Sequence, residues 1–221
     1  MGSSGKRRWC EDTTIRDCVV HDHHRQGISV ISARNLLVEN CTFSITGGTA
    51  PEAGIDLEAD SEDECFVNCV IRKCIFESNS GHAILVYLKP MSSKSEDVSI
   101  RFEDCVSRMG RPGMTLDDFQ DMNQTGWSGI SVGAIKDDGP QGLIEFINCT
   151  TENTGKEGIR VYDKSANGVK VRFVNCSVKQ PWVSTFRNDG LPRVPIILHA
   201  RRTRLAKGLG NVEFINCHVY D

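Results

Sequence analysis

The apolar and polar positions of this chain follow two short patterns that return at intervals along it. Both patterns alternate apolar and polar residues with a period of two, which predicts β-strands with one buried face. The first ends in a polar residue followed by cysteine, and it occurs at residues 36–43, 70–76, 100–105, 144–149, 171–176 and 212–217. The second is close to Gly-Ile-x-Val, and it occurs at residues 27–30, 54–58, 83–86, 129–132 and 158–161. Short strands repeated in this way predict a solenoid.

The spacing between the two patterns shows where extra residues enter each turn, or coil, of the predicted solenoid. The shortest spacing is 10 residues, and it separates Cys18 from Ile28, Cys74 from Ile84 and Cys149 from Ile159. Longer spacings in the other coils predict insertions at residues 42–53, 106–128 and 177–194. Because these insertions leave the same edge of the solenoid, we expect them to form one wall of a groove.

The ten cysteines would suggest a disulfide framework by number alone. Seven of them occupy the same place in the repeat, which predicts an inward column of reduced thiols that pack as small apolar groups. The members of this predicted column are Cys18, Cys41, Cys74, Cys105, Cys149, Cys176 and Cys217. The Asn, Asp or Lys before each cysteine predicts a sharp bend, because Asn and Asp tolerate the left-handed backbone conformation.

Composition and charge exclude two classes of partner. The 221 residues carry 26 basic and 29 acidic side chains, with a formal net charge of −3 and no basic face, so nucleic acid is not expected as a partner. No apolar run is long enough to cross a membrane. We interpret residues 1–9 as a tail, a tag remnant or a truncation point without the apolar core of a secretion signal, and residues 10–221 as one domain.

The two patterns together resemble the repeat of right-handed parallel β-helix proteins of the pectate-lyase-like superfamily, and residues 25–30 and 48–56 resemble a bacterial branch of β-helix repeats. The resemblance implies an all-β, single-stranded solenoid of about six to seven coils. It also implies an extracellular or cell-surface location, and a scaffold shared by polysaccharide lyases, hydrolases, epimerases, phage tailspikes and non-catalytic proteins. Since solenoids need polar caps, we expect a further chain segment or a partner to cover the ends.

Stacking the coils predicts two outward columns on the Gly-Ile-x-Val strands. The first column is Ser29, Asp56, Leu85, Ser131, Arg160 and Ile197, and the second is Ile31, Glu58, Tyr87, Gly133, Tyr162 and His199. Asp56 and Glu58 lie two residues apart on one strand, so their backbones are separated by about 6.6–6.8 Å on the same face. We therefore predict that catalytic chemistry, if present, uses Asp56, Glu58, His82 and Arg25.

Tyrosines, acids and arginines along a groove predict an acidic polysaccharide as the ligand. The candidates for binding it are His24, Gln26, Tyr87, Trp127, Arg160, Tyr162 and His199. A lyase or epimerase would neutralise a uronate carboxylate with Arg25, or with Ca²⁺ held by the acids, and then move the adjacent proton. A hydrolase would use the two carboxylates as acid and base. Residues 21–24 do not predict a metal site, because consecutive residues in a tight turn rarely converge on one ion.

Two alternatives stay open at this stage. The first is an enzyme, a polysaccharide lyase or glycoside hydrolase, with its groove over Asp56, Glu58, His82 and Arg25. The second is a non-catalytic β-helix that serves as a scaffold or glycan-binding segment of a larger secreted or phage protein, with Asp56 and Glu58 on a solvated sheet face.

Overall fold

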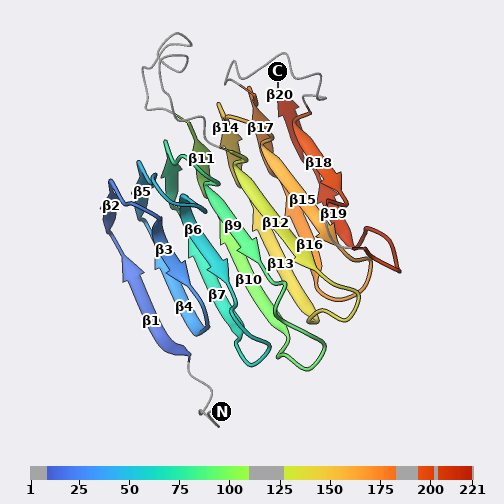
Figure 1. Cartoon of the computed structure of the whole chain (residues 1–221). Helices are drawn as coiled ribbons and strands as arrows, with labels where there is room; N and C mark the ends of the chain where they lie inside the picture. Colours follow the sequence, from blue (N-terminus) through green and yellow to red (C-terminus); the bar gives the residue numbers. More distant parts are fainter. Residues whose placement is uncertain (1–8, 110–126, 183–193, 202–203, 221) are drawn as a thin grey trace.

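The structure is a computed structural model, and it describes residues 9–109, 127–182, 194–201 and 204–220. Within these residues the chain forms β-strands and no helix, so no helix there has the length and apolar character needed to cross a membrane. Every strand-to-strand pairing is parallel. The chain winds as a stack of coils from the N-terminal to the C-terminal end, as the colour sequence of Figure 1 shows. It is therefore the parallel β-helix that the repeat predicts.

Each of the first six coils contributes one strand to each of three sheets, and coil seven contributes to two of them. Sheet 1 contains β1 (Cys10–Arg16), β4 (Ala33–Glu39), β7 (Phe66–Arg72), β10 (Val98–Glu103), β13 (Gly142–Ile147), β16 (Lys170–Val174) and β19 (Val212–Ile215). Sheet 2 contains β2 (Val19–His21), β5 (Thr42–Ser44), β8 (Ile75–Glu77), β11 (Val106–Arg108), β14 (Thr150–Glu152), β17 (Ser177–Lys179) and β20 (His218–Tyr220). Sheet 3 contains β3 (Gln26–Val30), β6 (Ala53–Glu58), β9 (Ile84–Tyr87), β12 (Ile130–Ile135), β15 (Ile159–Lys164) and β18 (Ile196–His199). Coil one is thus β1 to β3, and coil seven is β19 and β20.

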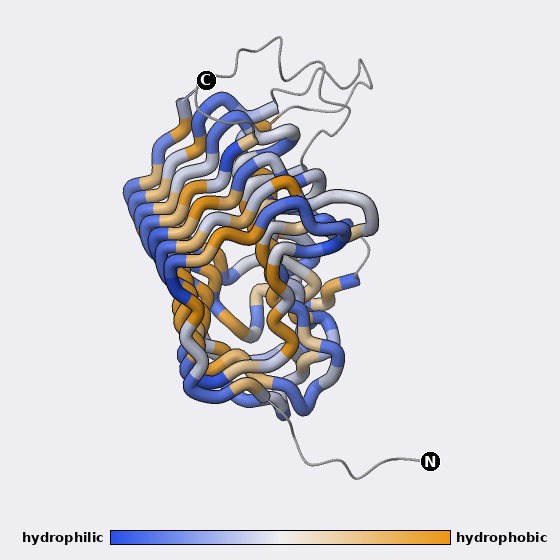
Figure 2. Tube along the Cα trace, turned by 90° about the vertical axis from the view of Figure 1, so that its left-hand side faces the viewer, coloured by the Kyte–Doolittle hydropathy of each residue, from blue (hydrophilic) through white to orange (hydrophobic). Residues whose placement is uncertain are grey.

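The inward side chains stack on their equivalents in the next coil and form one continuous core. In sheet 1, the rings of Phe102, Phe146, Phe173 and Phe214 stack at successive centroid distances of 5.0, 4.9 and 4.8 Å. These distances match the separation of neighbouring strands, because in-register parallel pairing places identical residues directly above one another. The tube in Figure 2 shows the same repetition, because apolar and polar positions line up in rows from one coil to the next.

The bend between sheets 1 and 2 confirms the predicted role of the residue before each column cysteine. All seven of these residues have positive φ angles, namely Asp17, Asn40, Lys73, Asp104, Asn148, Asn175 and Asn216. The Asn40 side chain donates to Asp17 Oδ1 at 2.6 Å, and that of Asn148 donates to Asp104 Oδ1 at 3.1 Å, so the bends also bond from coil to coil. All ten cysteines are free thiols, as the reduced column requires.

The charged side chains on the outer face of sheet 1 form ion pairs with one another. Arg101 and Arg172 each approach Glu145 at 3.2 Å, and Arg172 also approaches Glu213 at 2.9 Å. Since these partly exposed pairs neutralise one another along the stack, this face offers an anionic or cationic ligand little uncompensated charge.

Candidate functional site

A groove of about 460 Å³ lies over the outward face of sheet 3. Its lining residues are Arg25, Ala50, Pro51, Glu52, Glu58, His82, Leu85, Tyr87, Trp127, Arg160, Tyr162 and Arg201. A second cavity, of about 530 Å³, lies at the N-terminal end of the stack and is lined mostly by apolar residues of coils one and two. The groove over sheet 3 is the candidate site, because it alone of these two gathers aromatic rings with both signs of charge.

The strand register produces the two outward columns that the sequence predicts. Asp56 pairs with Leu85, Leu85 with Ser131, and Ser131 with Arg160. Each pairing advances one coil, so Asp56 and Arg160 lie about 14 Å apart along the stack at about 4.8 Å per coil. The second column likewise runs from Glu58 through Tyr87 and Gly133 to Tyr162 and His199, whereas Ile31 lies beyond the end of β3.

Asp56 faces outward yet is completely shielded from solvent, with 0% of its surface exposed. Gln26 Nε2 donates to Asp56 Oδ2 at 2.8 Å, whereas Asp56 Oδ1 is buried and accepts no hydrogen bond in the structure. Burial raises the pKa of the Asp56 carboxyl to about 7; the Gln26 hydrogen bond opposes this rise, and the Glu58 carboxyl adds to it. Asp56 is therefore a carboxyl group that exchanges a proton near neutral pH.

The Asp56 and Glu58 carboxyls act as a pair. Glu58 raises the pKa of Asp56 through its charge. Asp56 Oδ1 is buried without a hydrogen-bond partner, which also disfavours the charged form of the carboxyl. The open, solvated sheet face considered as an alternative for these two acids is thus wrong for Asp56, because the groove walls and the Gln26 amide enclose its carboxyl.

The C-terminal half of the groove is cationic. The Arg160 side chain is 7% exposed, its Nε lies 3.3 Å from His199 Nε2, and its guanidinium lies 4.8 Å from the centroid of the Tyr162 ring. Burial lowers the pKa of Arg160, and the Glu157 charge counteracts this. Burial followed by the Arg160 charge lowers the pKa of His199. Among the described residues, the arginines that form ion pairs with carboxylates do not include Arg160. Its guanidinium can therefore donate hydrogen bonds to an anionic ligand.

His82 and Trp127 form the wall between the two halves. Their rings meet edge to face with centroids 5.3 Å apart, and the Lys156 ammonium lies 4.4 Å from the centroid of the Trp127 ring. Burial, reinforced by the Arg160 and Lys156 charges, lowers the pKa of His82 to about 3. His82 is consequently neutral at pH 7, and its buried Nδ1 has no hydrogen-bond partner in the structure. A neutral imidazole in this position is suited to hydrogen bonding rather than to charge neutralisation.

Tyr162 reaches over the adjacent coil because Gly133 leaves space there. A Cβ atom at Gly133 would lie 2.3 Å from Tyr162 Cε1. Burial raises the pKa of Tyr162 to about 12, which Arg160 partly offsets. We therefore expect Gly133→Ala to push the ring outward and to lower its pKa towards the ordinary value of about 10. Ultraviolet titration of tyrosinate, with Tyr162→Phe identifying the relevant step, would measure this; an unchanged titration would show that the ring accommodates the methyl group.

The structure gathers most of the predicted residues and leaves one, His24, apart. Arg25, Glu58, His82, Tyr87, Trp127, Arg160 and Tyr162 line the groove, with Asp56, Gln26 and His199 directly behind its surface. His24 instead bonds Thr49 Oγ1 at 3.0 Å in a separate depression lined by Asp22, His23 and Gly48. The wall predicted from residues 42–53 contributes Pro51 and Glu52, whereas most of the other two insertions lies outside the described residues.

Sequence reasoning missed Arg201 and Lys156. Arg201 follows β18, and its backbone N–H donates to the buried Asp163 carboxylate at 2.5 Å, which fixes the loop beside the groove. No repeat signal marks either residue, because both lie in connections rather than in the columns. Among the described residues, no three His, Cys, Asp or Glu side chains are arranged to hold a metal ion.

Comparison with known proteins agrees with this architecture. Residues 2–106 match the family model described as "Right handed beta helix region". Together with three all-parallel sheets, this match supports a right-handed parallel β-helix fold. A solved structure of QnrB1, a plasmid-mediated fluoroquinolone resistance protein, is 8% identical over 87% of each chain with a TM-score of 0.25, a likeness too weak to bear on fold or function. The search of curated proteins gives no match.

Proposed function

We propose that the groove over sheet 3 binds an acidic oligosaccharide and that Asp56 and Glu58 transfer a proton when the bound chain is cleaved. The observation that carries this proposal is the buried Asp56 carboxyl, whose pKa of about 7 is set by burial and by the adjacent Glu58. A carboxyl that titrates at the working pH can serve as a general acid, and an ionised neighbour can serve as the base.

The other groove residues support a carbohydrate with anionic groups. Tyr87, Tyr162 and Trp127 line the groove and offer ring surface to a sugar. Arg160 and Arg201 line its C-terminal half and suit a carboxylate, because guanidinium groups bind carboxylates with paired hydrogen bonds. Arg25 lies near enough to Asp56 for its charge to lower the Asp56 pKa. It can therefore neutralise a uronate carboxylate at the reacting sugar.

The Arg25 charge beside the two carboxyls favours elimination over hydrolysis. Glycoside hydrolysis needs only an acid and a base, supplied by two carboxyls. Elimination also needs a cation that neutralises the uronate, and the Arg25 charge reaches Asp56. In elimination, neutralisation of the uronate by Arg25 acidifies the C–H next to its carboxylate, Glu58 removes that proton, and protonated Asp56 donates to the departing glycosidic oxygen.

Complete burial of Asp56 favours a second candidate, a non-catalytic glycan-binding β-helix. With 0% of its surface exposed, Asp56 touches no ligand unless the groove opens. In this case Asp56 would order the groove floor through Gln26, and binding would depend on Arg160 and the aromatic rings alone.

One set of assays separates the two candidates. The protein would be incubated with polygalacturonate, alginate and glycosaminoglycans, with and without Ca²⁺, while unsaturated uronate is followed by ultraviolet absorbance and new reducing ends are counted. The elimination proposal expects unsaturated product from at least one polymer and a loss of at least about 100-fold in rate for Asp56→Asn, because a general acid contributes about that much. Binding without product supports the second candidate, and absence of both rules out the groove as a glycan site.

Arg160 provides a separate test of binding. We expect Arg160→Gln to weaken oligosaccharide binding about 10- to 100-fold, because it removes charge-assisted hydrogen bonds worth about 1.5–3 kcal/mol. Calorimetry with the best-bound oligosaccharide would measure the change. Arg16→Gln is the matched control, since it removes the same charge from an arginine side chain that is 62% exposed on sheet 1. An equal loss of affinity in both variants would mean that Arg160 acts on the ligand through long-range charge and makes no direct contact with it.

A further inference from the structure

The cysteine column at the bend between sheets 1 and 2 places free thiols in consecutive coils. Cys18 is followed one coil later by Cys41, and Cys176 is followed one coil later by Cys217. Equivalent residues of neighbouring parallel strands have Cα atoms about 4.8 Å apart, which is within the range of about 4.4–6.8 Å that disulfides span. Cys41 Sγ also lies 3.7 Å from the Ile15 carbonyl oxygen of coil one, so its thiol points between the coils.

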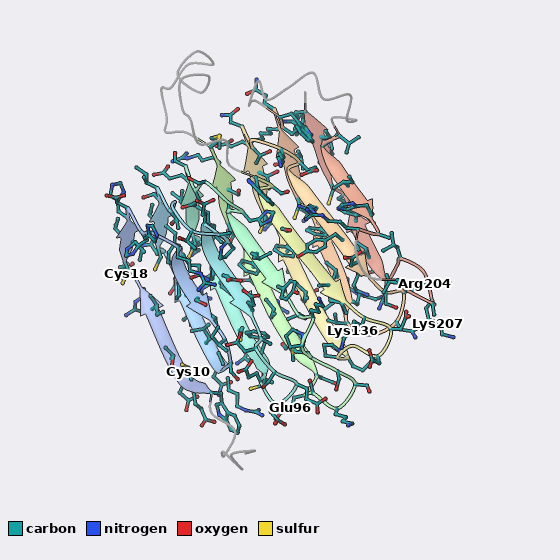
Figure 3. The ribbon with its side chains drawn as sticks, viewed as in Figure 1. Cys10, Cys18, Glu96, Lys136, Arg204 and Lys207 are labelled. Carbon is teal, nitrogen blue, oxygen red and sulfur yellow. The ribbon has the colours of Figure 1, made fainter. Side chains whose placement is uncertain are left out.

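Exposure divides the column into reactive ends and an enclosed middle. Cys18 and Cys217, the first and last members, are half-buried, and Figure 3 shows Cys18 at the outer edge of the stack. Their neighbours Cys41 and Cys176 are each 1% exposed. The three central members, Cys74, Cys105 and Cys149, are at most 2% exposed. A dissolved oxidant can therefore reach the column only through its two ends.

We propose that Cys18–Cys41 and Cys176–Cys217 are modification sites at which a low-molecular-weight disulfide oxidant closes a bond between adjacent coils. The outer thiolate attacks the oxidant disulfide and releases one small thiol. The inner thiolate then attacks the outer sulfur and releases the second small thiol. Two protein thiols become one disulfide, and the oxidant is reduced to two thiols. The central three cysteines stay reduced, because each disulfide blocks the approach of the oxidant to them from that end of the column.

The expected consequence is a staple at each end of the solenoid. Among the described residues, coil one pairs with coil two alone and coil seven with coil six alone, and strands with one pairing neighbour open more readily than strands with two. A disulfide ties coil one to coil two and coil six to coil seven. Burial raises the pKa of both Cys41 and Cys217, so oxidation is expected to accelerate as the pH rises and more thiolate forms.

Peptide mapping after oxidation tests the proposal. The folded protein would be treated with oxidised glutathione, the remaining thiols alkylated, and the disulfides located by mass spectrometry. We expect the two named linkages, with Cys74, Cys105 and Cys149 alkylated only after unfolding. Hydrogen exchange of amides in β1 and β2 should slow by about tenfold or more upon oxidation.

Three variants keep the result interpretable. Cys18→Ser and Cys217→Ser change the half-buried outer members, so each should retain the fold and lose one linkage while keeping the other. Cys10→Ser is the matched control: Cys10 is exposed at the far end of β1, about 25 Å from Cys18 at about 3.3 Å per residue, and both linkages should persist. Persistent glutathione adducts on Cys18 and Cys217, linkages within the central three, or disulfides between molecules would each overturn the proposal.

Discussion

Asp56→Asn should stabilise the protein by about 2–4 kcal/mol at pH 8 and change its stability little at pH 4. The Asp56 pKa is about 7 in the folded protein and 3.8 in its ordinary state, so the folded protein holds a proton that the unfolded chain releases between these pH values. Stability is then fully present below about pH 4 and falls as the pH rises through 7. At about 1.4 kcal/mol per pKa unit the whole effect is about 4 kcal/mol. Denaturant unfolding at both pH values would measure it.

Asn is an informative replacement because its amide group imitates protonated aspartic acid. Its oxygen can still accept from Gln26, and it stays neutral at every pH, as the protonated carboxyl is. Asp138→Asn, which changes an exposed carboxylate in a turn after β12, serves as the control and should leave the pH profile unchanged. A pH profile for Asp56→Asn that matches the unmodified protein would mean that Asp56 does not carry the pH dependence. The variant is also expected to lose cleavage, so stability and activity oppose each other at this residue.

Phe146→Ala should cost about 3–5 kcal/mol of unfolding free energy, the other large effect that the structure predicts. The Phe146 ring is fully buried and stacks on Phe102 at 5.0 Å and on Phe173 at 4.9 Å. Its removal leaves a cavity between two rings that are held in place by the strand pairing of their own coils, so the gap cannot collapse easily. The midpoint of denaturant unfolding would report the loss.

Phe214 is the matched control within the same stack. Its ring stacks on Phe173 with centroids 4.8 Å apart, on no second ring among the described residues, and it is only partly buried. We expect Phe214→Ala to cost less than half as much as Phe146→Ala. Equal costs at the two positions would indicate that the core unfolds as one unit regardless of where in the stack it is weakened.

The fold could be predicted from the sequence because every copy of the repeat has the same pattern of apolar strand positions and bend residues. Each apolar column needs in-register stacking, and each Asn-Cys or Asp-Cys pair needs a left-handed bend, so Asn40 and Asn148 adopt positive φ angles as expected. The same register fixed which outward residues are neighbours, including Asp56 beside Leu85 and Arg160 beside Ser131.

The environment of the site was less accessible to sequence reasoning. Asp56 is fully buried and bonded to the Gln26 side chain, neither of which the column pattern specifies. The separate position of His24 beside Gly48, and the approach of Arg201 to the groove, depend on connections in the same way. Proximity along a column was therefore predictable, whereas solvation and proton affinity required the packed structure.

The in-register pairing of coils also limits how such a groove can change in evolution. Inserting or deleting a coil between β6 and β15 would keep every bend and every core contact intact, yet it would alter the distance between the Asp56–Glu58 carboxyls and Arg160 by about 4.8 Å per coil. The distance between these two groups of side chains can therefore change only in discrete steps of one strand spacing, with finer adjustment left to the loops.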